Sequence, residues 1–204
     1  MKRRSYSAVE RRRTVEAGRE RILAAARELL DDDASEGFSI DAVARRAGVA
    51  RMTVYNQFES KAGLLEALFD SLALRGPLGG MAEIFKQPDT LAALDAYVAL
   101  FGTFWTLNRR THRRLRAAAM HDDELATALA ARNERRRRGV TELVRRFGKD
   151  ARPIVAREEA VNVIFVLLSF DTFDALAGPD RSPEDVVPVV RRLIRGVLGL
   201  FADS

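Results

Sequence analysis

The sequence predicts an all-α protein made of two domains, and two observations support this prediction. Apolar residues recur at three- and four-residue spacing along most of the chain, and no alternating strand pattern of any length is present. The run from Arg75 to Gly80 interrupts this periodicity with three Gly and one Pro. We therefore expect a small helical domain over residues 15–74 and a larger helical domain over residues 75–204.

The N-terminal segment 1–14 is strongly basic and carries no apolar periodicity. We expect a disordered arm here, which either only keeps the protein soluble or adds contacts to DNA phosphates or the minor groove. Its charged residues are Lys2, Arg3, Arg4, Arg11, Arg12 and Arg13 on the basic side and Glu10 on the acidic side.

The first predicted helix covers about residues 15–30. Three consecutive acids, Asp31 to Asp33, follow its apolar repeat. Negative charge is unfavourable at the C-terminal end of a helix, so we expect the helix to end there. The apolar repeat consists of Ile22, Ala25, Ala26, Leu29 and Leu30.

Residues 38–61 predict two short helices joined by a tight turn. Ser39 is a good N-cap for the first helix, and Gly48 can adopt the left-handed conformation that ends it. Val54 and Phe58 then recur four residues apart on a second helix. Two helices joined in this way form a helix-turn-helix unit, whose second helix can lie in the DNA major groove. The first helix carries the apolar stripe Ile40, Val43, Ala44 and Ala47.

The exposed side of the second helix is polar, and no acid lies between Asp41 and Glu59. Arg, Asn and Gln side chains can pair with base edges, and Thr and Tyr hydroxyls can reach phosphate. A generic helical hairpin with a solvated polar face is the alternative. The DNA-binding candidates are Ser39, Arg51, Met52, Thr53, Tyr55, Asn56, Gln57 and Lys61.

Several motifs occur in a characteristic order: Arg21-Ile22-Leu23-Ala24-Ala25-Ala26 with Leu29-Leu30, then Phe38-Ser39-Ile40, then Val43-Ala44-Arg45-Arg46-Ala47-Gly48-Val49, then Thr53-Val54-Tyr55-x-x-Phe58-x-Ser60-Lys61 with Leu64-Leu65. With these motifs, residues 18–70 resemble the N-terminal three-helix DNA-binding domain of TetR-family transcriptional regulators. One departure is Ala50, where the family usually has a Ser that caps the recognition helix.

Beyond the helix-turn-helix unit, Ser60 is expected to cap a helix that runs to about Leu74. The larger domain is predicted to hold helices at about 81–86, 90–107, 111–119, 122–147, 156–177 and 183–202. Pro188 lacks an N–H, so the last helix either kinks there or begins after it.

Two predicted helices of the larger domain supply candidates for a ligand pocket. The helix 90–107 carries aromatic residues along one face, and the mostly apolar helix 156–177 contains polar residues that need partners if buried. Plain core packing is the alternative for both. The pocket candidates are Tyr97, Phe101, Phe104, Trp105, Asn108, Asn162, Val166, Ser169 and Phe173.

The sequence does not favour an enzyme or a metal protein. It has no cysteine, its histidines at positions 112 and 121 have no metal-binding spacing, and no Gly-rich phosphate loop is present, so we expect no cofactor. Asp171 and Asp174 could pair with arginines or face a cationic ligand. The arginines at 109–116 and 132–138 are expected to form solvated helix faces, and a second nucleic-acid surface is the alternative.

We expect a cytoplasmic location without membrane insertion. No signal peptide is apparent, and the longest apolar run, residues 163–168, is far shorter than a membrane span of about 20 residues.

The resemblance implies a homodimeric regulator, most often a repressor, that binds a palindromic double-stranded operator and is released by a small, largely apolar molecule. It also implies that helices 156–177 and 183–202 make the dimer interface. A ligand-independent helix-turn-helix protein is the alternative. The interface candidates are Val190, Leu193, Ile194, Val197 and Phe201.

Overall fold

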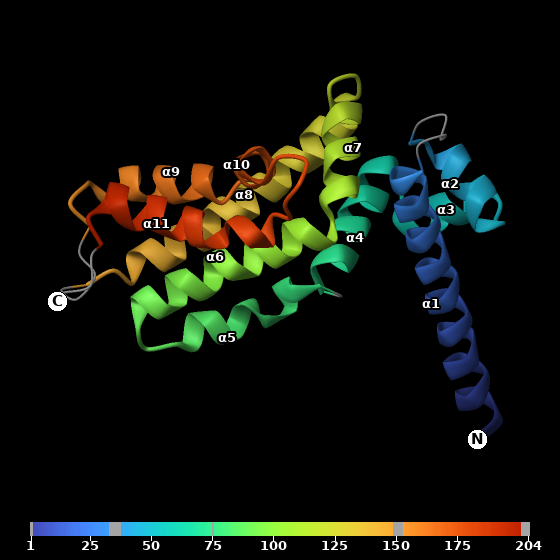
Figure 1. The fold of residues 1–204 in the computed structure, drawn as a ribbon. Helices are drawn as coiled ribbons and strands as arrows, with labels where there is room; N and C mark the ends of the chain where they lie inside the picture. The colour runs from blue at the N-terminus through green and yellow to red at the C-terminus, as the bar shows by residue number, and fades with distance from the viewer. Residues whose placement is uncertain (1, 33–37, 75, 149–152, 201–204) are drawn as a thin grey trace. The chain divides into compact units, whose positions relative to one another are not determined.

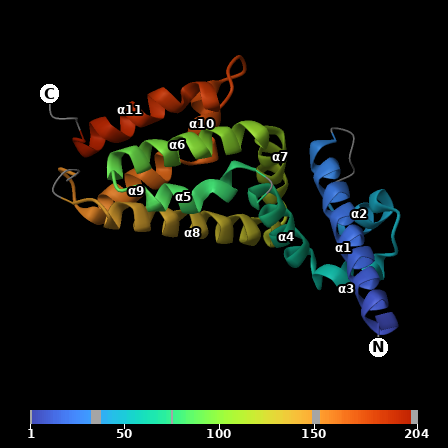
Figure 2. The same cartoon turned by 90° about the horizontal axis from the view of Figure 1, so that it is seen from below.

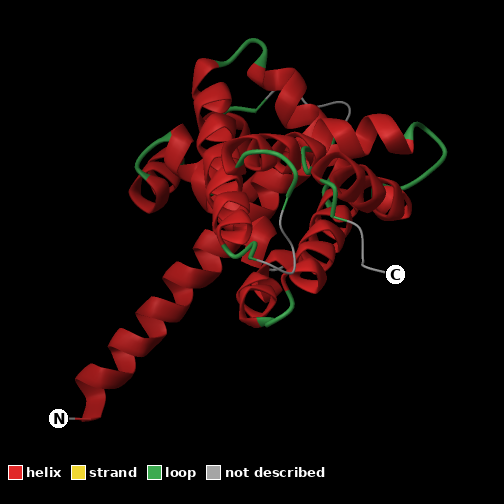
Figure 3. Ribbon diagram, turned by 90° about the vertical axis from the view of Figure 1, so that its left-hand side faces the viewer, coloured by secondary structure: helices red, strands yellow, loops and turns green. Residues whose placement is uncertain are grey.

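The computed structural model describes residues 2–32, 38–74, 76–148 and 153–200, and these segments contain helices and loops without a strand (Figures 1 and 3). The all-α prediction is confirmed. The helices are α1 (Lys2–Asp31), α2 (Ile40–Ala47), α3 (Arg51–Phe58), α4 (Lys61–Leu74), η1 (Pro77–Gly80), α5 (Met81–Lys86), α6 (Thr90–Leu107), α7 (Arg109–Ala119), α8 (Asp123–Arg145), α9 (Arg157–Leu167), α10 (Phe170–Ala177), η3 (Glu184–Val186) and α11 (Val187–Leu198).

The chain divides into two compact units. The first comprises Met1–Ser71 and Arg113–Ala128, and the second comprises Leu72–His112 and Leu129–Ser204. The first unit thus takes in the end of α7 and the start of α8, which the sequence analysis placed in the larger domain. Tertiary contacts within the first unit explain this, because Arg114 donates a hydrogen bond to the Asp32 carbonyl.

The core of the first unit forms where α2 packs against α1 and α3. The apolar repeat of α1 is buried, as predicted, together with the stripe of α2. Val54 and Phe58 of α3 and the apolar face of α4 are also buried. The buried α4 residues are Leu64, Leu65, Leu68, Phe69 and Leu72.

Helix α1 differs from its prediction at the N-terminal end. It begins at Lys2, whereas the sequence analysis placed a disordered arm over residues 1–14 and a helix start near Val15. Residues 2–17 contain neither Gly nor Pro, and Arg is a good helix former, so the helix continues through the basic segment. The N-terminal half of α1 extends away from α2 and α3 (Figure 2).

Helix α6 is the core helix of the second unit and contacts α5, α10 and α11. Its aromatic residues are buried, and Gly102 allows close approach because a Cβ there would lie 2.3 Å from the Val187 Cγ2 atom. By length and composition α6 could cross a membrane, and so could α9 and α10 taken as one bent span. The core helices of soluble proteins share this apolar character, and the buried face of α6 accounts for it.

The prediction of one continuous helix over 156–177 is wrong. The segment forms α9 and α10, which are bent by 50° relative to each other. Ser169 stops the first helix and caps the second, because its side chain accepts a hydrogen bond from the Thr172 backbone N–H. At the last helix, Pro188 lies in the first turn of α11, in agreement with a helix start near that residue.

Candidate nucleic-acid interface

The turn between α2 and α3 is built as the sequence predicts. Ser39 has extended backbone angles and caps α2, since its side-chain oxygen accepts a hydrogen bond from the Ala42 N–H at 3.2 Å. Gly48 adopts the left-handed conformation, with φ 63° and ψ 40°. The Val49 N–H then donates to the Ala44 carbonyl at 3.0 Å, which closes the end of α2 and directs the chain into α3.

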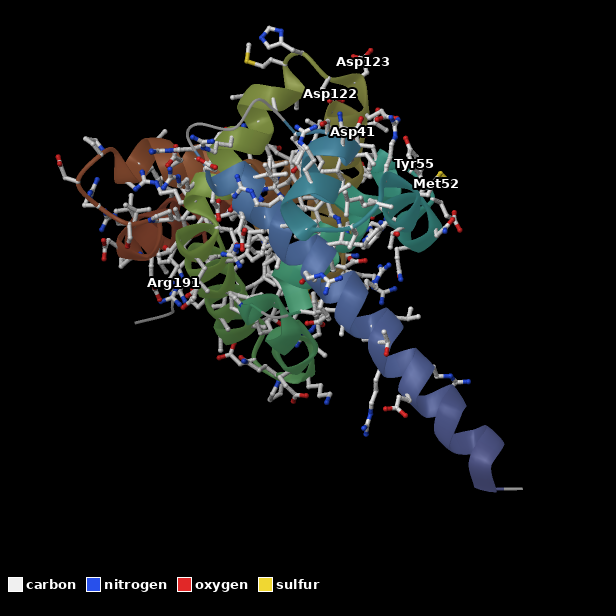
Figure 4. All side chains as sticks on the ribbon, turned by 90° about the vertical axis from the view of Figure 1, so that its right-hand side faces the viewer. Asp41, Met52, Tyr55, Asp122, Asp123 and Arg191 are labelled. Carbon is white, nitrogen blue, oxygen red and sulfur yellow. The ribbon has the colours of Figure 1, made fainter. Side chains whose placement is uncertain are left out.

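Helix α3 buries one side and leaves the other accessible, as a groove-binding helix requires. Val54 and Phe58 anchor it in the core, while Met52 remains 63% exposed. Met52 and Tyr55 lie on the outward side of α3 (Figure 4). The remaining candidates on this helix are either exposed or half-buried: Arg51, Thr53, Asn56 and Gln57. Ala50 makes no side-chain cap hydrogen bond, as its apolar side chain predicts.

Arg51 is held in place by two neighbours. Its Nη1 atom lies 3.2 Å from the Asp41 carboxylate, and Nη2 donates to the Tyr55 hydroxyl at 3.3 Å. The hydrogen bond to Tyr55 is the larger cause, and the negative charge of Asp41 the next, of a guanidinium pKa that is raised above its ordinary value. Arg51 therefore presents a constant positive charge in a restricted orientation at the start of α3.

A second arginine, Arg19 of α1, fastens the other end of α3. Its Nη1 atom donates to the Gln57 carbonyl at 3.0 Å, and its guanidinium lies 4.4 Å from the centre of the Phe58 ring. The sequence does not predict this contact, because nothing in the local pattern joins positions that far apart. The contact ties the orientation of α3 to the long helix α1.

The start of α4 completes the site. Ser60 caps α4, as predicted, by accepting a hydrogen bond from the Gly63 N–H at 3.0 Å. Glu59 before it has a φ of 66°, which is uncommon for a non-glycine residue and allows the chain to turn sharply out of α3. Lys61, a candidate phosphate ligand, donates a hydrogen bond to the Asp122 carboxylate.

Known proteins share this architecture. The family described as "Bacterial regulatory proteins, tetR family" matches residues 22–68, which span the C-terminal third of α1, all of α2 and α3, and the first half of α4. Residues 22–68 of this chain therefore match the N-terminal domain that this family's model describes. No curated protein sequence matches the chain.

Solved structures of transcriptional regulators resemble most of the chain in fold. NalD from Pseudomonas aeruginosa, described as the secondary repressor of the MexAB-OprM multidrug efflux pump, is 22% identical with a TM-score of 0.69, and the match covers 91% of this chain and 97% of NalD. A transcriptional regulator from Rhodococcus sp. Rha1 is 20% identical with a TM-score of 0.65, covering 89% of this chain and 96% of that one. Most of this chain therefore shares its fold with these proteins.

The candidate pocket residues on α6 and at its C-cap lie in the interior of the second unit. Trp105 packs 4.7 Å from His112 and 5.6 Å from Phe170, measured between ring centres. Tyr97 is fully buried, its hydroxyl has no hydrogen-bond partner, and burial raises the pKa of that hydroxyl despite the nearby Arg136 charge. The other buried candidates are Phe101, Phe104, Asn108 and Phe173.

The candidates on the segment 156–177 are not brought together as expected. Asn162 is exposed and accepts a hydrogen bond from Arg137, and Val166 is 57% exposed. Ser169 is used as the cap of α10. The expectation that these residues share one helix face with Phe173 is therefore wrong. That face required one continuous helix, and the break between α9 and α10 interrupts it.

The charged residues of the second unit also differ from a purely solvated arrangement. Arg109 Nε lies 2.6 Å from the Asp174 carboxylate, whereas Asp171 is exposed. His112 is buried among aromatic rings, and Arg136 is buried and donates to the Leu168 carbonyl at 2.8 Å. The prediction of solvated faces fails for these residues because tertiary contacts cover them.

The dimer candidates on α11 divide into two groups. Val190 and Ile194 are fully buried in their own protomer. Leu193 and Val197 are 39% and 48% exposed, and they form an outward apolar edge beside the exposed Gly196. Phe201 lies outside the described residues.

Proposed function

We propose that this TetR-family regulator is a cytoplasmic homodimeric repressor that binds a near-palindromic operator and is released by a small molecule. The observation that carries the proposal is the outward face of α3. Its polar side chains stand on a helix that Gly48, Val54 and Phe58 orient from behind. Such a face can read base edges, while the basic residues around it neutralise phosphates.

The dimer supplies the second copy of α3. Two copies read half-sites that lie about 34–36 Å apart in successive major grooves. The exposed Leu193 and Val197 support an interface along α11, because apolar side chains on one helix edge favour a partner helix. At Gly196 an added Cβ would meet nothing within 4 Å, so a partner can approach closely there.

The ligand step is supported by the buried aromatic residues around α6. A cluster of rings with one unsatisfied hydroxyl, that of Tyr97, is the kind of interior that binds a largely apolar molecule with one polar group. A ligand releases the operator only to the extent that it prefers the conformation that does not bind DNA. The alternative, a ligand-independent DNA-binding protein, requires no such preference.

Selection of bound duplexes from a random pool tests the proposal. We expect an enriched palindrome whose half-sites are one helical turn apart, which would establish DNA reading and the dimer together. Enrichment of a single unrepeated site would contradict the homodimer, and a pool that stays random would contradict sequence-specific regulation.

A further inference from the structure

Lys61 occupies a position where two roles compete. It is the first residue of α4, directly after the cap Ser60, and a lysine at this place beside α3 can reach a DNA phosphate. In the structure its ammonium group instead donates to the Asp122 carboxylate. The two side chains are only 18% and 24% exposed, so water and salt screen this ion pair less than a surface pair.

Asp122 divides its two carboxylate oxygens between two tasks. Oδ2 accepts from Lys61, while Oδ1 accepts from the Leu125 backbone N–H at 3.1 Å and caps the start of α8. Burial alone raises the pKa of this carboxyl, but the Lys61 hydrogen bond and the backbone N–H bonds outweigh burial and hold the pKa below its usual range. Asp122 is therefore a charged, pre-positioned acceptor at neutral pH.

We propose that Asp122 acts as an internal substitute for a DNA phosphate, which occupies Lys61 in the free protein and lowers the affinity for DNA. A lysine paired with a carboxylate brings almost no net charge to the duplex. Moving it to a phosphate exchanges one ion pair for another and leaves the Asp122 charge partly buried without its partner. Asp122 is thus a positioning residue that acts through Lys61.

The same contact gives the α7–α8 turn a role in regulation. Asp122 directly precedes α8, which continues without interruption as one helix to Arg145. A shift of the first turn of α8 that separates Asp122 from α4 frees the Lys61 ammonium group to bind a DNA phosphate. A shift that shortens the Lys61–Asp122 distance keeps Lys61 from the phosphate. This inference rests on the proposed DNA-binding function and on the predicted phosphate contact of Lys61.

Asp122→Asn tests the inference, with Asp123→Asn as the matched control. The two positions are adjacent at the start of α8, and Asp123 is exposed (Figure 4). Each substitution removes one negative charge from the same helix terminus, but only the first removes the acceptor charge for Lys61. Asparagine is as good an N-cap as aspartate, so the Leu125 hydrogen bond is retained in Asp122→Asn.

The measurement is the dissociation constant of the full-length protein for a mixed-sequence duplex of about 40 base pairs, at several salt concentrations. We expect Asp122→Asn to bind about three- to ten-fold tighter near 0.1 M salt. We also expect its plot of log affinity against log salt to be steeper by up to about 0.9, the value for one additional phosphate neutralised. Asp123→Asn should leave the slope unchanged.

Lys61→Gln completes a double-mutant cycle. It should lower the affinity of the wild type by less than it lowers the affinity of Asp122→Asn, because Asp122 already pairs with Lys61 in the wild type. It should also abolish the gain in the Asp122→Asn background. Equal gains from both asparagine variants, weaker binding by Asp122→Asn, or a gain that survives Lys61→Gln would each overturn the inference. A wild-type protein that binds no duplex would instead overturn the proposed function, and this inference with it.

Discussion

At the scale of single residues, Arg51 illustrates how the interface combines charge with geometry. Asp41 and Tyr55 restrict its guanidinium before any DNA is present. A planar group in a defined orientation can donate two parallel hydrogen bonds to guanine, and ordering it in advance reduces the entropy lost on binding. A lysine at this position would keep the positive charge but could not donate two parallel hydrogen bonds.

Arg51→Lys should therefore separate specificity from affinity. We expect binding to mixed-sequence DNA to change less than about two-fold, while preference at one operator position falls by about 1–3 kcal/mol. The measurement is the base preference of each half-site in a selected pool. Arg45→Lys, on the exposed side of α2, is the control. An unchanged preference in the Arg51 variant would remove this residue from base readout.

Residue by residue, the sequence predicted what depends on neighbours along the chain. The caps at Ser39 and Ser60 and the left-handed Gly48 follow from local backbone requirements, and all three are confirmed. The contacts of Arg19 with Gln57 and of Lys61 with Asp122 could not be predicted. Their partners lie 38 and 61 positions away, and only the packed fold brings them together.

At the scale of elements, the N-terminal half of α1 continues past the core that its C-terminal half helps to form. Arg12 and Arg13 are exposed there, and they lie about 10 Å along the helix from Arg19, at 1.5 Å per residue. Because Arg19 is fastened to the C-terminal end of α3, this basic stretch starts beside the recognition helix. It is therefore within reach of phosphates that flank the half-site.

Replacing both Arg12 and Arg13 by Gln should weaken binding to every duplex alike and lower the salt slope by up to about 1.8, at about 0.9 per lost phosphate contact. Titrations on the selected operator and on mixed-sequence DNA measure both effects. The control replaces Arg138 and Arg145, exposed basic residues of α8, by Gln. Equal slopes for the two double variants would assign the N-terminal arginines to solubility alone.

Helix boundaries were predictable where a cap or breaker marks them and not where the fold imposes them. Residues 157–177 contain neither Gly nor Pro, so periodicity predicted one helix. In the structure Ser169 caps α10, and the neighbouring Leu168 carbonyl accepts hydrogen bonds from Trp105 Nε1 at 3.1 Å and from Arg136 at 2.8 Å. Both donors come from other helices, and a pattern search along one segment does not detect them.

At the scale of the whole molecule, the proposed effector step can be tested at Tyr97. Its hydroxyl faces α8 so closely that a Cβ at Gly139 would lie 2.3 Å from the oxygen, yet no hydrogen bond satisfies it. An unsatisfied buried hydroxyl costs about 1–3 kcal/mol, and this cost disappears when the group is removed or when a ligand pairs with it.

Tyr97→Phe should therefore melt no lower than the wild type in the absence of ligands. We expect apolar compounds that stabilise the wild type in a thermal-shift library to stabilise the variant less, because they lose the hydrogen bond to the hydroxyl. Equal stabilisation of both proteins by these compounds would show that the effector does not bind at the Tyr97 hydroxyl. A markedly lower melting temperature would indicate that the hydroxyl contributes to packing rather than to ligand recognition.

The proposed dimer would join two DNA-binding units, and the exposed edge of α11 provides the test. Leu193 and Val197 are partly exposed, so arginine at both positions can extend into solvent and leave the protomer folded, whereas Val190 and Ile194 belong to its core. In a dimer the four added charges would face one another across the interface. Leu193→Arg with Val197→Arg should give monomers by light scattering, with Arg192→Gln on the same helix remaining dimeric.

The monomer should bind a single half-site about as the wild type does. Its affinity for the full palindrome should fall by about a hundred-fold or more, because the second half-site is no longer bound intramolecularly. A double variant that stays dimeric would place the interface on another surface of the second unit.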